Sequence, residues 1–181
     1  MPKVGFVYYT KTDITGALVV AAIAELKVNG AEVFYHQIQG SEIIEGRFVN
    51  AEVFESLSNC DAIVFASPTY MGGVAAQFKA FADASSDVWC TQGWSGKVAS
   101  GITSGSALNG DQSSTLQYMA TLASQHGMVW IGLESATQHE KKIDRLGCQL
   151  GVVSQSDDGE VDDVDLATAR HLVHRIVNLL R

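Results

Sequence analysis

The chain has little proline and little positive charge. Two prolines among 181 residues leave few positions that force a break in a helix or a strand. The 12 Lys and Arg residues are scattered and are outnumbered by 20 acidic residues, so the chain lacks the positive face that phosphate-backbone binding requires. We therefore expect long regular elements and no nucleic-acid partner.

Cysteine is also scarce. Cys60, Cys90 and Cys148 are far apart, odd in number and without C-x-x-C spacing, which fits neither a disulfide framework nor a zinc site. We expect no bound metal and a reducing, cytoplasmic environment.

Long apolar runs are missing as well. No window reaches 18 apolar residues, and the apolar run in the N-terminal MPKVGFVYY is short and followed by polar residues, unlike a signal peptide. We expect a soluble chain that does not enter a membrane. Its length suits one domain, which we place at residues 1–181.

Several catalytic fingerprints are absent. There is no G-x-G-x-x-G and no G-x-S-x-G, and Ser95-Gly96-Lys97 resembles the end of a P-loop but has Thr91 where the first Gly should be. Nucleotide hydrolysis and serine esterase chemistry therefore have no support. Six acids within 157–165 carry most of the net charge of −8 but lack calcium-loop spacing, so we interpret them as a solvated loop before the last helix.

What is present is an alternation of short apolar runs with longer helical patterns, which is typical of a parallel sheet with crossover helices. The predicted strands are Lys3–Tyr9, Glu32–His36, Asp61–Ser67, Lys97–Thr103 and Met128–Leu133. The predicted helices are Thr15–Asn29, Ala51–Leu57, Ala75–Ala84, Gln112–Gln125 and Leu166–Leu180. Residues 134–164 show no clear period, and we expect a long surface excursion there.

Three unusual loops follow predicted strands, and in an open parallel sheet ligands bind at the carboxyl ends of the strands. Thr10, Thr12 and Thr15 lie at the start of a helix, where amides and hydroxyls can hold a phosphate or simply cap the helix. Residues 67–73 contain proline, tyrosine and two glycines, and residues 103–110 are mostly small. Each could be an ordinary turn, but together they predict a shallow site for a flat, phosphorylated ligand.

These loops carry a resemblance. Thr10-x-Thr12-x-x-Thr15 resembles the flavodoxin phosphate loop. The middle of the chain resembles flavodoxin-like NAD(P)H:quinone oxidoreductases of the Trp-repressor-binding type. The segments that carry this second resemblance are Ser67 to Asp83, Trp89, Gly96-Lys97-Val98-Ala99-Ser100 and His126-Gly127-Met128. The resemblance implies a flavodoxin-like, three-layer, doubly wound α/β fold whose five-stranded parallel sheet has the order 2-1-3-4-5. It also implies FMN as cofactor, NAD(P)H as co-substrate, a small-molecule quinone as acceptor in a ping-pong reaction, and a homo-oligomer, either a dimer or a tetramer.

The resemblance also implies roles for single residues. The phosphate loop would be Thr10, Thr12, Asp13, Ile14 and Thr15, the flavin ring would lie against Pro68, Thr69, Tyr70, Met71 and Gly72, and the site would be completed by Ser104, Gly105 and Ser106. Trp89, in a stretch expected to be irregular, would cover the substrate face. His126 would lie beside the flavin and contact substrate, unless it only caps a helix.

One residue departs from the family pattern. Asp13 stands where the family carries glycine, and two unit charges about 4 Å apart repel by about 4 kcal/mol at an effective dielectric constant of about 20. The carboxylate must point away from the phosphate, or FMN binds weakly. Two other interpretations stay open: a flavodoxin-type electron carrier without substrate turnover, and a relative that has lost its flavin.

Overall fold

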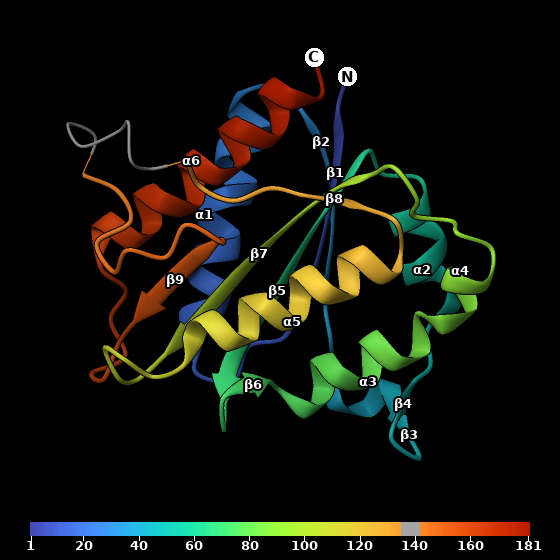
Figure 1. Cartoon of the computed structure of the whole chain (residues 1–181), viewed down its shortest axis with the longest axis horizontal. Coiled ribbons are helices and arrows are strands. Elements are labelled where there is room, and N and C mark those ends of the chain that lie inside the picture. Colours follow the sequence, from blue (N-terminus) through green and yellow to red (C-terminus); the bar gives the residue numbers. More distant parts are fainter. Residues whose placement is uncertain (135–141) are drawn as a thin grey trace.

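The computed structural model describes residues 1–134 and 142–181 and shows a central sheet with helices on both faces (Figure 1). The strands of the sheet are β1 (Lys3–Tyr8), β2 (Glu32–Gln37), β5 (Ala62–Tyr70), β7 (Val98–Gly105), β8 (Val129–Trp130) and β9 (Val152–Gln155). They follow the order β2-β1-β5-β7-β8 with parallel pairing along this path. The predicted flavodoxin-like fold and its 2-1-3-4-5 strand order are confirmed.

The helices form two outer layers. They are α1 (Ile14–Val28), α2 (Ala51–Ser58), α3 (Ala76–Ala84), α4 (Ser86–Cys90), α5 (Gln112–Gln125) and α6 (Asp163–Leu179). Successive side chains of a strand point to opposite faces, so Phe6 and Val64 pack with α1 and α6, whereas Val7 and Phe65 pack with α2, α3 and α5. Both faces of the central strands are therefore buried, which explains their nearly continuous apolar sequences.

The fifth strand differs from the prediction. Instead of one strand over Met128–Leu133, β8 pairs with the beginning of β7, and β9 pairs with its end. Residues 131–151, which we call the insertion, separate β8 from β9 in the sequence, so two short strands take the place of the single predicted one. A Cβ atom on Gly151 would lie 2.5 Å from the carbonyl oxygen of Gly101, so glycine allows β9 to approach β7 closely.

The expectation that residues 134–164 form a surface excursion is wrong for β9. Val152 and Ser154 are fully buried in the sheet. A four-residue strand buried on both faces has no alternating pattern, which is why the sequence did not reveal it. Residues 135–141 of the same stretch lie outside the described residues.

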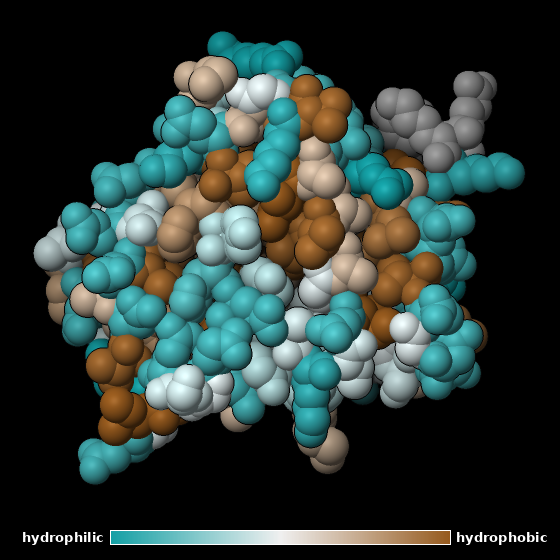
Figure 2. Space-filling model, turned by 180° about the vertical axis from the view of Figure 1, so that it is seen from behind, coloured by the Kyte–Doolittle hydropathy of each residue, from teal (hydrophilic) through white to brown (hydrophobic). Residues whose placement is uncertain are grey.

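Smaller elements were not predicted. They are a 3-10 helix η1 (Gly40–Glu42), a hairpin of β3 (Ile43–Ile44) with β4 (Arg47–Phe48), and β6 (Gly73–Val74), which pairs antiparallel with the end of β5. The β3–β4 hairpin projects at the lower right of Figure 1 and carries apolar side chains at the lower left of Figure 2. None of the described helices is long and apolar enough to cross a membrane.

Candidate functional site

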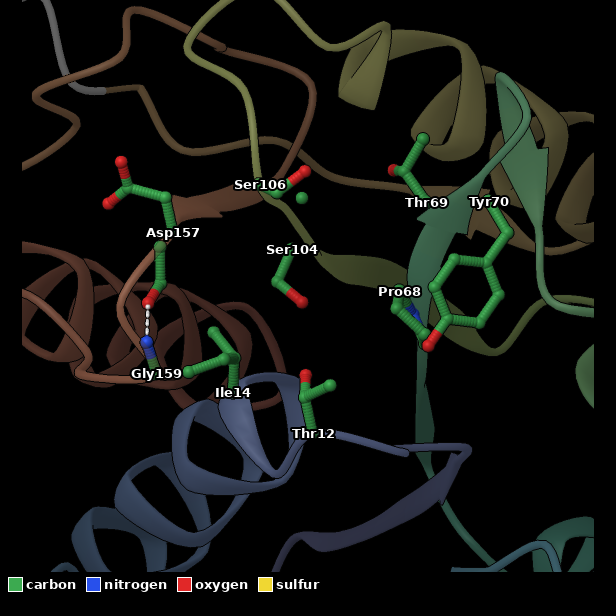
Figure 3. Close-up of a pocket in the computed structure, with 11 residues that line it drawn as sticks. Thr12, Ile14, Pro68, Thr69, Tyr70, Ser104, Ser106, Asp157 and Gly159 are labelled. Atoms are coloured by element: carbon green, nitrogen blue, oxygen red, sulfur yellow. Dashed lines mark hydrogen bonds between the residues drawn. The ribbon is translucent and has the colours of Figure 1, made fainter.

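A cavity of about 310 Å³ opens at the carboxyl ends of the strands, between the start of α1 and the ends of β5, β7 and β9 (Figure 3). Its lining residues are Thr12, Ile14, Pro68, Thr69, Tyr70, Ser104, Gly105, Ser106, Ser156, Asp157 and Gly159. All three loops that the sequence singled out therefore contribute to one cavity. This is the place at which an open parallel sheet binds ligands.

The α1 end of the cavity is rich in hydrogen-bonding groups. Asp13 is the N-cap residue, but its side chain makes no capping bond to the first-turn amides. The amide of Gly16 donates to Thr10 Oγ1 at 3.3 Å, and the hydroxyls of Thr15 and Ser104 are 2.7 Å apart, which ties α1 to β7. The Gly16 amide is therefore taken, and the amides of Ile14 and Thr15 with the Thr12 hydroxyl are the donors left at this helix N-terminus that fit a phosphate.

The conformation of Asp13 explains how a carboxylate is accommodated in this loop. Its backbone is left-handed, with φ of 62°, a region that Asp tolerates better than most residues. The residue is exposed and is not among those that line the cavity. Burial, Tyr35 and then Asp13 raise the pKa of the Tyr8 phenol, so the Asp13 charge is close enough to Tyr8 to act on it.

The second wall comes from the end of β5. Pro68, Thr69 and Tyr70 line the cavity, and the tyrosine ring, 41% exposed, offers a flat face. Met71 and Gly72 do not line it, because they form the tip of the β5–β6 turn with φ of 50° and 77°. The Met71 side chain is fully exposed there.

A third wall, from the loop after β9, was missed at the level of sequence. The Gly159 amide donates to Ser156 Oγ at 3.1 Å, and these two residues line the cavity with Asp157 (Figure 3). The sequence predicts only a solvated loop for this acidic run. Without β9 in the sheet, nothing indicated that the loop after it would reach the same edge as the other three.

The structure does not bring His126 to the cavity of its own chain. The 14-residue α5 begins near the cavity and spans about 21 Å. His126, its C-cap residue, therefore lies at the other end of the strands, away from their carboxyl ends. The imidazole is 1% exposed, with Nε2 2.9 Å from Ser85 Oγ and its ring 4.4 Å from the ring of Trp94. Burial lowers its pKa to about 4. A catalytic role for His126 stays a prediction.

Trp89 is also away from the cavity of its own chain. The expectation of an irregular stretch is wrong, because Trp89 belongs to α4. The side chain is 45% exposed and is not among the residues that line the cavity. Its predicted place over the substrate therefore stays a prediction. Among the described residues, no group of three or more His, Cys, Asp or Glu side chains could hold a metal ion.

Comparisons with known proteins agree with the geometry. The family described as NADPH-dependent FMN reductase matches residues 10–142. A flavodoxin, FldP, from Pseudomonas aeruginosa is 34% identical over 87% of this chain and 88% of its own length. An NAD(P)H dehydrogenase (quinone) from Archaeoglobus fulgidus is 29% identical over 99% of this chain and 97% of its own.

A solved structure supports the same relationship. The crystal structure of a flavodoxin, WrbA-like protein from Agrobacterium tumefaciens matches with a TM-score of 0.79 and 32% identity, over 99% of this chain and 97% of that one. The resemblance that the sequence motifs carry is confirmed.

Proposed function

The chain belongs to the NADPH-dependent FMN reductase family, and from this premise we propose that it transfers two electrons from NAD(P)H to a quinone through FMN. The observation that carries the proposal is the cavity itself. It joins a helix N-terminus that the Asp13 side chain does not cap, which suits a phosphate, to an aromatic and hydroxyl-lined space, which suits a flat ring.

Each part of the cavity has a task in this proposal. The free first-turn amides of α1 and the Thr12 hydroxyl hold the phosphate without a basic side chain. Thr10 and Thr15 are buried and do not line the cavity, and they position the loop through the Gly16 amide and the Ser104 hydroxyl. Pro68 and Tyr70 orient the ring and keep water from one of its faces. Bound FMN supplies the hydride chemistry, so no nucleophile of the chain is needed. Nicotinamide leaves before the quinone enters the same space, which gives ping-pong kinetics.

The proposal is tested by titrating the purified chain with FMN and then measuring NAD(P)H oxidation with and without benzoquinone. We expect quenched flavin fluorescence, benzoquinone-dependent oxidation, and parallel lines in double-reciprocal plots at several quinone concentrations. A chain that leaves the absorbance and fluorescence of FMN unchanged would contradict the proposal.

A second candidate is a flavodoxin-type electron carrier, favoured by the likeness to the flavodoxin FldP. A carrier binds FMN but exchanges electrons with another protein. In the same assay it would quench FMN fluorescence and show no benzoquinone-dependent oxidation of NAD(P)H. The third interpretation, a relative without flavin, rests on Asp13, which does not line the cavity, although another acidic residue, Asp157, does.

We further propose that the chain acts as a homo-oligomer in the cytoplasm. Trp89 and His126, to which the resemblance gives places beside the flavin, are remote from the cavity of their own chain. Because Trp89 is partly exposed, it could contact the cavity of a second copy of the chain in an oligomer.

A further inference from the structure

Three threonines form a small hydroxyl network under the cavity. Thr69 Oγ1, at the end of β5, lies 2.9 Å from Thr103 Oγ1 on β7 and 2.8 Å from Thr115 Oγ1 on α5. Thr103 and Thr115 are fully buried, whereas Thr69 is half-buried and lines the cavity (Figure 3). The network therefore connects two buried hydroxyls to one that a ligand can reach.

Counting protons fixes the direction of these hydrogen bonds. Each threonine hydroxyl has one proton and can accept two bonds. Among the described residues, the three hydroxyls make only the two bonds just given, so one proton is left over. If Thr69 donated to Thr103 or Thr115, the receiving hydroxyl would keep its own proton buried without an acceptor, which costs the full desolvation of that donor.

From this we infer that Thr103 and Thr115 both donate to Thr69 and act as positioning residues for the cofactor site. Both acceptor positions of Thr69 are then filled, and its own proton is directed to the cavity. Thr69 can only donate to a ligand. The group opposite must be an acceptor, such as a carbonyl oxygen or an unprotonated ring nitrogen. This inference rests on the proposed function, because the edge of an oxidised flavin carries acceptors of this kind.

The affinity of the chain for FMN, measured by fluorescence quenching, tests the donor. Thr69→Val keeps the shape, removes the proton that faces the ligand and leaves the Thr103 and Thr115 hydroxyls without their acceptor. We expect the dissociation constant for FMN to rise about tenfold, the size of one ordinary hydrogen bond. Thr69→Ser keeps the hydroxyl and is expected to stay within about twofold of the native chain on the same grounds. The absorption bands of the bound flavin should shift in Thr69→Val and not in Thr69→Ser.

The positioning role needs a double-mutant cycle. Thr103→Val with Thr115→Val frees the Thr69 hydroxyl to rotate, and we expect FMN to bind about threefold to tenfold more weakly. In a Thr69→Val background the same pair should cause no further loss, because it acts through a hydroxyl that is already gone. Equal losses in both backgrounds would show ordinary packing damage and overturn the inference.

Controls separate folding from positioning. Thr103→Ser and Thr115→Ser keep both hydroxyls and should restore native affinity. Thr168→Val removes a buried hydroxyl of α6 that bonds to Val164 and Asp144, so it should lower thermal stability and leave FMN affinity unchanged. If the native chain binds no FMN, the proposed function fails. If the native chain binds FMN and Thr69→Val binds it equally well, only the present inference fails.

Discussion

Asp13 tests the proposal that the loop before α1 holds a phosphate although it carries a carboxylate. Glycine would adopt the left-handed backbone without strain, and removing an exposed carboxylate that does not line the cavity should matter little to the ligand. We expect Asp13→Gly to change the dissociation constant for FMN by less than about threefold, measured by fluorescence titration, since an exposed charge is well screened.

Asp13→Ala is the matched control for the backbone. Alanine lacks the tolerance of Asp for positive φ, so we expect the free energy of unfolding to fall by about 1 kcal/mol in urea denaturation, with FMN affinity unchanged. A gain in affinity of tenfold or more in both variants would show that the carboxylate faces the phosphate.

His126 predicts a pH dependence of stability. Ser85 Oγ donates to the carbonyl of Ala82 at 2.7 Å, so His126 Nε2 donates to Ser85, and the buried Nδ1 is unprotonated with no partner among the described residues. The native pKa of about 4 lies below the value of about 6.5 expected in an unfolded chain. Between these two values, the unfolded chain binds more protons than the native one.

The free energy of unfolding should therefore fall as pH drops from about 6.5 to about 4, and the contribution of His126 is complete above this window. It amounts to at most about 3 kcal/mol. Urea denaturation at several pH values should show a shallower pH slope in His126→Gln, whose amide stays neutral. An identical slope in both chains would contradict a neutral, buried imidazole.

At the residue scale, prediction worked where the signal was local. The hydroxyls of Thr12 and Ser104 are predicted because Thr12 lies in the loop after the first predicted strand and Ser104 directly follows the fourth, and position after a strand determines place in this fold. Met71 and Gly72 form a tight turn with two positive φ angles and do not line the cavity, so their predicted place at the ring stays a prediction. The direction of a side chain beyond a turn is not encoded in spacing.

At the scale of elements, one buried ion pair fastens the insertion between β8 and β9 to the sheet. Arg145 donates through Nε and one terminal nitrogen to the two carboxylate oxygens of Asp165, each at 2.8 Å, and Asp165 is 1% exposed. Ser154 of β9 donates to the same carboxylate at 2.7 Å. Asp165 in turn raises the pKa of the Arg145 guanidinium. The pair therefore joins the insertion, β9 and α6.

Removing one partner of this pair should be costly, because it leaves a buried charge without compensation. We expect Arg145→Ala to lower the free energy of unfolding by about 3 kcal/mol in chemical denaturation. The double variant Arg145→Met with Asp165→Leu removes both charges and should be more stable than Arg145→Ala alone. If Arg145→Ala lowered the free energy of unfolding by less than about 0.5 kcal/mol, the pair would behave like an exposed surface ion pair and the prediction would be wrong.

The split fifth strand shows the limit of reading elements from sequence. Helices such as α1 and α5 have long periodic patterns that identify them, and the long central strands have apolar runs bounded by turns. β9 has four residues, and its place is set by pairing with β7 and by the close approach of Gly151 to Gly101. Such contacts between distant segments leave no local pattern.

For the whole molecule, the alternation of strands and helices is enough to predict the layers, because only a few right-handed arrangements bury the central strands on both faces. Assembly is not predictable in this way. Ile44, Val49, Met71 and Trp89 are large apolar side chains that one chain leaves at least 45% exposed. Covering such surface is favourable by about 25 cal/mol per Å² of apolar area.

The proposed self-association gives a prediction for the whole assembly. If Trp89 serves the cavity of another copy, quinone turnover per chain should fall on dilution below the dissociation constant of the oligomer, whereas FMN affinity should not. Sedimentation equilibrium should show a dimer or a tetramer at the concentrations that support turnover. Trp89→Ala should keep the amount of FMN bound per chain, because Trp89 does not line the cavity of its own chain. The same variant should lower quinone turnover, because the cavity of the other copy loses the side chain that covers the substrate. A chain that is monomeric at every concentration and keeps undiminished turnover would refute the shared site.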